Sequence, residues 1–578
     1  MEDSRKIHYF FLVLVFLFGC YGAYVNYKVL QEDTTPFIYD ILNSYVTSID
    51  HYRFLQQGDI IGFINHYITK YSRDYPALYM FQTFPFYAIF GISEDAAAMS
   101  NTIYLFILLF SVYFIGKKMK NSYAGFLSAS IVLFIPGVLS FSRVYLPDFG
   151  LAAFFLLSLA LFLYSDFFRD RKYSILFGAS AGLGMLIKYT FFVYIGVALF
   201  ILYLRHLKNE KKLLLTKQQR SNLMISLSIA VLFMLLCYPM NFLNALGYIT
   251  RKSSYDATVA FNDTGIFQRW NLVMDRYVFE MNDMLAGFVY PVFLIIVLLL
   301  LEKVFSRRKT QEKKTIELQD LVYISLIIFL FSLNSTASVR YLIFMLPFAA
   351  LLIGVYIYTK FDIFLGYFKN RNETKFMVFV LLVLLLVSSA GSYYSAWLEQ
   401  KKPAEIADDI FIYGLQVPKH HHNKHIEIIE AINRRMEGLN GLSVLSFQES
   451  EVMYIVSHSK HLSGYGYEFP PACLTTPDYV DRGSCYIPEE INCDWYFLQN
   501  DIIIDSDIHT SIKTAEVWAK FPERKEILDE ILNVWESCKE NYILAETIED
   551  VPVLTSYIPR EYTNSTLYLY VKKSKLSS

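Results

Sequence analysis

Apolar segments of bilayer-spanning length fill the chain up to Trp397 and then stop. A helix rises about 1.5 Å per residue, so about 20 apolar residues cross the hydrocarbon layer, and roughly eleven segments here approach that length with their neighbours. Their nearly uncharged centres include Leu12–Tyr27, Ile103–Phe114, Val289–Leu301 and Phe376–Val387. The pattern predicts an α-helical, multi-pass membrane protein followed by a polar C-terminal domain.

The composition supports this class. Of 578 residues, 54% are hydrophobic and only 18% are charged, whereas the surface of a soluble protein of this size would need more charge. The formal net charge of −2 says little, because the two signs are segregated along the chain. We expect the bilayer as a partner and no nucleic acid.

Basic loops predict the orientation, because Lys and Arg are enriched in the cytoplasmic loops of membrane proteins. Arg5 and Lys6 put the N-terminus in the cytoplasm, and the apolar segment that ends at Tyr27 lacks a small-residue cleavage site, so we expect a retained first helix. With alternating crossings, the inner loops hold Lys117–Lys120, Arg169–Lys172, Arg205–Lys217, Arg307–Lys314 and Lys369–Lys375. An odd number of spans places the C-terminal domain outside the cytoplasm.

We predict two domains, a membrane domain over residues 1–398 and an extracytoplasmic α/β domain over 399–578. Strand-like runs at Leu442–Phe447, Asp501–Ile504 and Leu567–Val571 alternate with helical spacing at Ile426–Met436 and Glu526–Trp535. Four of the six cysteines fall in this tail, which suits one or two disulfides: Cys473, Cys485, Cys493 and Cys538.

The first outward loop, about residues 29–97, is the most unusual connection in the membrane domain. Long connections between packed elements are usually functional or disordered, and this loop is too rich in Tyr, Phe and Ile for disorder. It begins with the carboxylates Glu32 and Asp33 directly after the first helix, and amphipathic interfacial helices fit its middle. It closes with Tyr75-Pro-Ala-Leu-Tyr79.

Cations at predicted outer helix ends run against the positive-inside trend. Arg143, Lys188 and Arg340 occupy such ends, and an unpaired charge at Lys188, between two spans with almost no loop, costs a few kcal/mol. Lys70 and Arg73 lie on the same predicted side. Together these residues predict an anion site at the outer surface, and a lipid phosphate is the anion most naturally found there.

The order of several motifs resembles a known family. The acidic pair after the first helix and the Tyr75-Pro-Ala-Leu-Tyr79 loop end are followed by Ser142-Arg-Val-Tyr-Leu-Pro-Asp148. Gly182-Leu-Gly-Met-Leu-Ile-Lys-Tyr189 and Arg340-Tyr-Leu-Ile-Phe-Met-Leu-Pro347 come next. Over about residues 7–398 the chain looks like the GT-C glycosyltransferases of the protein O-mannosyltransferase and aminoarabinose transferase type.

The resemblance implies a sugar donor linked to a polyprenyl phosphate and an acceptor protein, lipid or glycan at the outer face. The family's acidic pair matches Glu32-Asp33 in two registers, and we favour Asp33 as the catalytic base. Lys70 and Arg73 are equal candidates for the loop's phosphate-binding cation, beside Arg143, Lys188 and Arg340. The relatives favour a bacterial or archaeal plasma (inner) membrane.

Three residues are supporting candidates in this interpretation. Asp148, beside Pro147 at a helix start, is expected either to orient Arg143 by an ion pair or to accept from free backbone N–H groups. Tyr75 and Tyr79 belong to the loop motif. The scheme requires no cofactor, and a divalent metal is compatible with it but not indicated by the residues.

Two other classes compete with a transferase. A multi-pass transporter or lipid flippase also has many helices and a few buried charges, but we find no internal repeat in the chain. A glycan ligase or polymerase would typically place its long outward loop late in the chain, whereas here the longest inter-helix loop comes first.

Overall fold

The structure, a computed structural model, describes residues 2–32, 39–69, 78–210, 215–235, 295–297, 299, 316–332, 343–365, 442–444, 493, 501–506, 533–557 and 560–576. The contacts divide the chain into two compact units. The first contains Met1–Gln31 and Thr47–Val417, and the second contains Glu32–Val46 and Pro418–Ser578.

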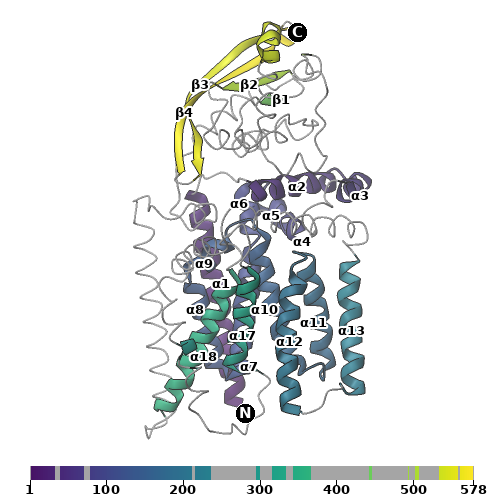
Figure 1. Ribbon diagram of the computed structural model, residues 1–578, viewed down its shortest axis with the longest axis vertical. Coiled ribbons are helices and arrows are strands. Elements are labelled where there is room, and N and C mark those ends of the chain that lie inside the picture. The colour runs from purple at the N-terminus through teal and green to yellow at the C-terminus, as the bar shows by residue number, and fades with distance from the viewer. Residues whose placement is uncertain are drawn as a thin grey trace, which may run out of the picture. The chain divides into compact units, whose positions relative to one another are not determined.

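The first unit is a helix bundle (Figure 1). Its long helices are α1 (Glu2–Glu32), α7 (Thr102–Met119), α8 (Ser122–Phe134), α10 (Pro147–Ser165), α11 (Arg171–Met185), α12 (Phe191–Glu210), α13 (Lys217–Met234), α17 (Leu318–Ser332) and α18 (Met345–Leu365). Three described helical stretches are long and apolar enough to cross a membrane: Arg5–Gln31, Glu94–Met119 and Pro147–Ser165. Four shorter apolar helices accompany them, so the predicted multi-pass helical class is confirmed.

Five further helices of the described chain follow α1 where the sequence predicts an outward loop. They are α2 (Tyr39–Gln56), α3 (Ile60–Thr69), α4 (Leu78–Phe81), α5 (Phe84–Phe90) and α6 (Glu94–Met99). A further short helix, α9 (Pro136–Ser142), precedes α10. The described parts of the loop are therefore mainly helical, as expected for its middle.

Small residues let the helices of the bundle approach closely. A Cβ on Gly125 of α8 would collide with the backbone oxygen of Tyr113 in α7, and the facing Gly116 lies against Gly125. Without a hydrophobic driving force between helices in lipid, such close van der Waals packing is what holds neighbouring spans together.

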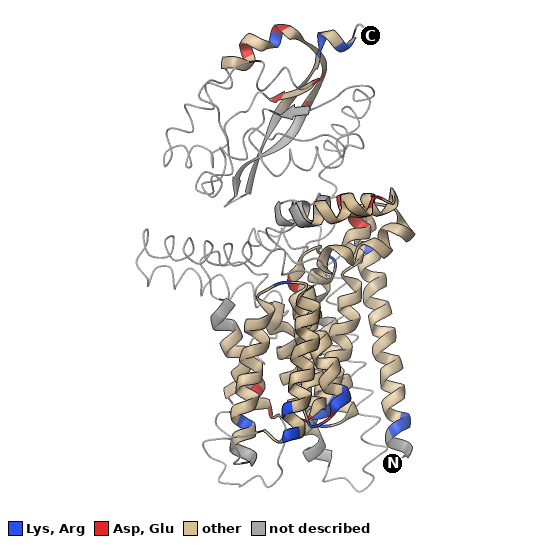
Figure 2. Ribbon diagram, turned by 90° about the vertical axis from the view of Figure 1, so that its right-hand side faces the viewer, with Lys and Arg blue, Asp and Glu red and all other residues tan. Residues whose placement is uncertain are grey.

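Lys and Arg gather at the end of the bundle that holds the N-terminus (Figure 2). We call this the basic end. Arg205 of α12 crosses to α17 there and pairs with Glu317 and with Asp320, the latter at 2.9 Å. We call the opposite end, where α1 finishes and α7, α10 and α12 begin, the site end.

The described part of the second unit contains a four-stranded mixed sheet in the order β1-β2-β4-β3. The strands are β1 (Leu442–Val444), β2 (Ile502–Ser506), β3 (Tyr542–Tyr557) and β4 (Arg560–Lys572). β1 is parallel to β2, and the other pairs are antiparallel. The strands near residues 442, 502 and 567 are those the sequence predicts, whereas β3 was missed.

A helical turn at residues 533–538 packs its Trp535 against this sheet. The indole Nε1 donates to Asp505 Oδ2 over 2.9 Å, and the ring meets Tyr542 and Tyr570 edge to face. A disulfide joins Cys493 to Cys538, so one of the expected bridges is present. Cys473 and Cys485 lie outside the described residues. Strands and helix together give the predicted α/β character.

Candidate functional site

Arg143 lies in the short turn between α9 and α10 at the site end. Helix α9 ends at Ser142 and Pro147 starts α10, so the turn between them spans residues 143–146. The Arg143 side chain is buried, with 4% of the residue exposed, and its Nη2 donates to Ser140 Oγ over 3.4 Å. A guanidinium held in so dry a place is a strong binding group for an anion.

Lys188 lies in the next turn at the same end, between α11 and α12. Its ammonium donates to Asp148 Oδ1 over 2.8 Å, and Asp148 is almost fully buried in the first turn of α10. The ion-pair partner of Asp148 is thus Lys188, which neither of the two expected roles of Asp148 included. The reason is geometric, because the α10–α11 hairpin brings Lys188 back beside the residue that starts α10. The other oxygen, Oδ2, has no hydrogen-bond partner in the described part of the chain.

The end of the first outward loop packs onto both of these turns. Leu78 N donates to Leu186 O over 3.0 Å, next to the turn that holds Lys188. Tyr79 stacks on Tyr145 with ring centroids 4.6 Å apart, and the Tyr145 hydroxyl donates to Tyr79 O over 3.4 Å. The Tyr-Pro-Ala-Leu-Tyr motif therefore ends beside the two buried cations.

The side chains of the remaining candidates lie outside the described residues. Glu32 is the last residue of α1, and its side chain lies outside the described part. Asp33, Lys70, Arg73, Tyr75 and Arg340 lie outside the described residues. Of the predicted site, the structure brings together Tyr79, Arg143, Asp148 and Lys188.

Sequence reasoning missed three buried amides beside these residues. Asn26 of α1 donates to Ser142 Oγ over 2.7 Å, Asn101 donates to Val144 O, and Gln82 donates to Asn101 Oδ1 over 2.9 Å. Asn26 gave a usable signal, because a polar residue within an apolar spanning segment is costly unless it has a partner. Gln82, within the largely apolar stretch Met80–Phe90, gave a similar signal, whereas Asn101 stands between Ser100 and Thr102 and gave none.

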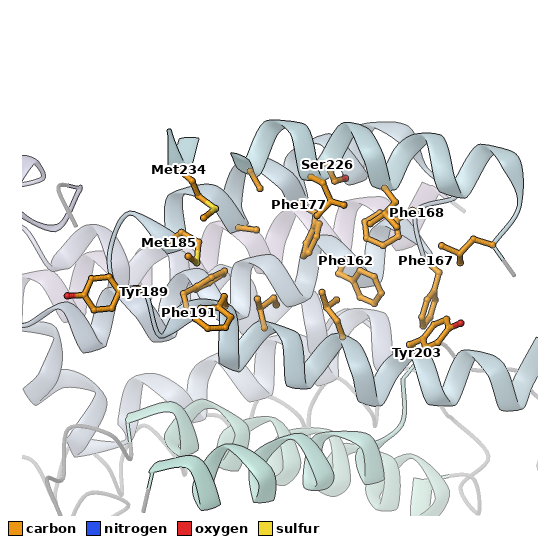
Figure 3. Close-up of a pocket in the computed structure, with 18 residues that line it drawn as sticks. Phe162, Phe167, Phe168, Phe177, Met185, Tyr189, Phe191, Tyr203, Ser226 and Met234 are labelled. Atoms are coloured by element: carbon orange, nitrogen blue, oxygen red, sulfur yellow. The ribbon is translucent and has the colours of Figure 1, made fainter. Parts of the chain in front are cut away.

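An apolar cavity of about 700 Å³ lies between α10, α11, α12 and α13 (Figure 3). Phe162, Phe177, Met185 and Phe191 are among its lining residues, and none of those described carries a charge. Its serine hydroxyl, that of Ser226, donates to Ser174 O over 2.6 Å. The cavity has room for hydrocarbon but supplies no acid, base or cation.

The described residues contain no group of three or more His, Cys, Asp and Glu side chains placed to hold a metal ion. What the site end does present is two basic side chains, one carboxylate and two stacked tyrosines. This arrangement can bind and neutralise an anion. It has the chemistry of a phosphate-binding site.

Comparison with known proteins gives the class. Residues 74–240, which include every residue brought together above, match the model of the dolichyl-phosphate-mannose-protein mannosyltransferase family. The fold is similar to that of ArnT from Cupriavidus metallidurans, solved bound to undecaprenyl phosphate, with 12% identity, a TM-score of 0.52 and coverage of 96% of this chain and 98% of that one. Over residues 74–240 the chain therefore matches a glycosyltransferase family, and its fold is that of the GT-C membrane enzymes.

A second solved structure shares the fold. The oligosaccharyltransferase of Archaeoglobus fulgidus, in complex with Zn and sulfate, has 11% identity and a TM-score of 0.50 over 95% of this chain and 72% of that one. No curated protein sequence matches the chain. The fold and the family match confirm the predicted GT-C membrane enzyme, whereas the transporter reading gains no support from them.

Proposed function

We propose that this enzyme transfers a sugar from a polyprenyl-phosphate-linked donor to an acceptor at the extracytoplasmic face of the membrane. The observation that carries the proposal is the convergence of two buried basic residues, Arg143 and Lys188, with the end of the first loop. The ArnT structure with undecaprenyl phosphate and the dolichyl-phosphate-mannose description of the matched family support a lipid phosphate as the anion.

The charges of the site suit a phosphate leaving group. Lys188 and Asp148 together are neutral, so the net positive charge comes from Arg143, with Lys70 or Arg73 and Arg340 as further proposed contributors. As the bond between the sugar and the phosphate breaks, negative charge grows on the phosphate oxygen. Basic groups already in place stabilise this charge without reorganisation, which lowers the barrier.

Asp33 is the proposed base, with Glu32 as the alternative. The carboxylate takes the proton from the acceptor hydroxyl or amine while the acceptor attacks the anomeric carbon from the face opposite the phosphate. The bond from that carbon to the phosphate oxygen breaks, and its electron pair stays on the phosphate. The configuration is inverted. One carboxylate suffices, because a phosphate leaves near neutral pH without protonation.

The proposed location follows from the distribution of charge. The basic end of the bundle (Figure 2) faces the cytoplasm and the site end faces outward, in a plasma (inner) membrane. The odd number of spans predicted from the sequence puts the C-terminal domain outside the cytoplasm. Acceptors reach the site from the outer face. A protein, a lipid headgroup and a glycan all offer the hydroxyl or amine that the chemistry requires.

The test compares Asp33→Asn with Glu32→Gln in purified protein and in a deletion strain. Mass spectrometry of glycans and lipids in the deletion strain identifies the sugar that is lost, and each variant is then assayed for restoring it. We expect Asp33→Asn to abolish transfer while undecaprenyl phosphate still binds, and Glu32→Gln to retain activity. Full activity of Asp33→Asn would refute Asp33 as the catalytic base. Solute flux without sugar transfer in vesicles would favour a transporter.

A further inference from the structure

The turn that carries Arg143 is held by side chains from three other parts of the bundle. The residue before it, Ser142, accepts a hydrogen bond from Asn26 of α1 over 2.7 Å. The residue after it, Val144, accepts one at its backbone oxygen from Asn101. Next along the chain, Tyr145 stacks on Tyr79.

Asn101 is used in an unusual way. It is the N-cap residue of α7, a position where an Asn side chain normally accepts from the helix's own N–H groups. Here the side chain makes no capping bond. Its oxygen accepts from Gln82 Nε2 over 2.9 Å, which leaves the Nδ2 group to donate to Val144 O. The amide therefore stabilises the Arg143 turn instead of its own helix.

We propose that Asn101 and Asn26 are positioning residues that fix the Arg143 guanidinium for the donor phosphate. This inference rests on the proposed function. Asn26 holds the Ser142 side chain and Asn101 holds the Val144 backbone, one on each side of Arg143. Together they restrict the turn and so set the direction in which the Arg143 side chain leaves it. A displacement of about 1 Å in a group that contacts the reacting centre can cost about 100-fold in rate, so a small rotation of this turn has a large effect.

The chain contains a matched control for this interaction. Asn222 of α13 is also buried, and its Nδ2 donates to a backbone oxygen, that of Phe168, over 2.8 Å. This bond holds the turn between α10 and α11 at the basic end. Asn222→Ala and Asn101→Ala thus remove the same kind of hydrogen bond from opposite ends of the bundle.

The experiment measures binding of undecaprenyl phosphate to the detergent-solubilised full chain, together with the melting temperature of each variant. We expect Asn101→Ala to weaken binding about tenfold or more. Asn222→Ala should leave binding unchanged while it lowers the melting temperature by about as much as Asn101→Ala does. In the double variant Asn101→Ala/Arg143→Ala, binding should be no weaker than in Arg143→Ala alone, because a positioning residue acts only through the residue it positions.

The outcomes distinguish the positioning role of Asn101 from the proposed role of Arg143 in phosphate binding. If Arg143→Ala weakens binding but Asn101→Ala does not, or if the two losses add, the positioning role is wrong and the proposed function stands. If Arg143→Ala itself binds as the parent chain does, both the role of Arg143 and this inference fail. Gln82→Met is the milder variant should Asn101→Ala not fold, since it keeps the Asn101 donor and removes only the bond that orients it, and it should weaken binding in the same direction.

Discussion

The ion pair between Lys188 and Asp148 makes a quantitative prediction about stability. Its atoms are 2.8 Å apart, and the side chains are only 10% and 1% exposed. Replacing Asp148 by Asn leaves a buried ammonium without its carboxylate. Removing one partner of such a pair costs about 3–5 kcal/mol in the free energy of unfolding. Lys188→Met should cost a similar amount, because it leaves the buried carboxylate unpaired.

The double variant Asp148→Asn/Lys188→Met separates stability from function. If the two losses were independent they would add to about 6–10 kcal/mol, the sum of two single losses. Because the double variant buries no unpaired charge, we expect it to recover most of the stability of the parent chain. Sugar transfer should remain lost, since the Lys188 charge is absent from the proposed phosphate site.

The assay is thermal unfolding of the four purified proteins in one detergent, with transfer activity measured on the same samples. A double variant as unstable as the sum of the singles would refute the coupling of the two charges inside the bundle. A double variant that is both stable and fully active would refute a role for Lys188 in catalysis and restrict the pair to holding α10 against α12.

Two further predictions concern other parts of the bundle. Gly125→Ala should destabilise the chain by about 1–3 kcal/mol, because its Cβ meets the Tyr113 backbone, while Gly196→Ala, which meets no atom within 4 Å, should not; equal melting temperatures would contradict the α7–α8 contact. Burial lowers the pKa of His51 from its ordinary 6.5, and the hydrogen bond from the ring to Thr47 O offsets this only in part. As the pH falls, the unfolded chain therefore binds a proton at His51 before the folded chain does. Stability should therefore fall as the pH drops below about 6.5, and His51→Gln should flatten that slope in a pH series of unfolding curves.

The helical spans could be predicted from the sequence because lipid leaves few alternatives. An apolar stretch such as Ile103–Phe114 must satisfy its backbone groups internally, and it lies within α7 as expected. Strand β3 could not be predicted in this way. Tyr542–Tyr557 carries Glu549, Asp550 and Pro552, and its pairing with β4 shifts register three times, so no clean alternation of apolar and polar positions appears.

The positions of charged residues in the sequence predicted part of the site, but the partners of these residues could not be predicted. Arg143 and Lys188 were found because cations at the predicted outer ends are unexpected. For Asp148 the sequence left open an ion pair with Arg143 and a role at the helix start, and neither pointed to Lys188, which lies 40 residues away. The role of Asn101 was invisible, because its bonds join residues that only the folded bundle brings together.

The bond between Leu78 and Leu186 has a consequence for biosynthesis. Spans enter the membrane one after another as the ribosome makes them. Tyr79 at the loop end can stack only after Tyr145 has been made, and Asn26 can bond only after Ser142, which follows it by 116 positions. A nascent chain that stops before Leu186 lacks both the Lys188 turn and the backbone oxygen that accepts from Leu78 N. The first outward loop therefore takes its final packing only after the α11–α12 turn has been made.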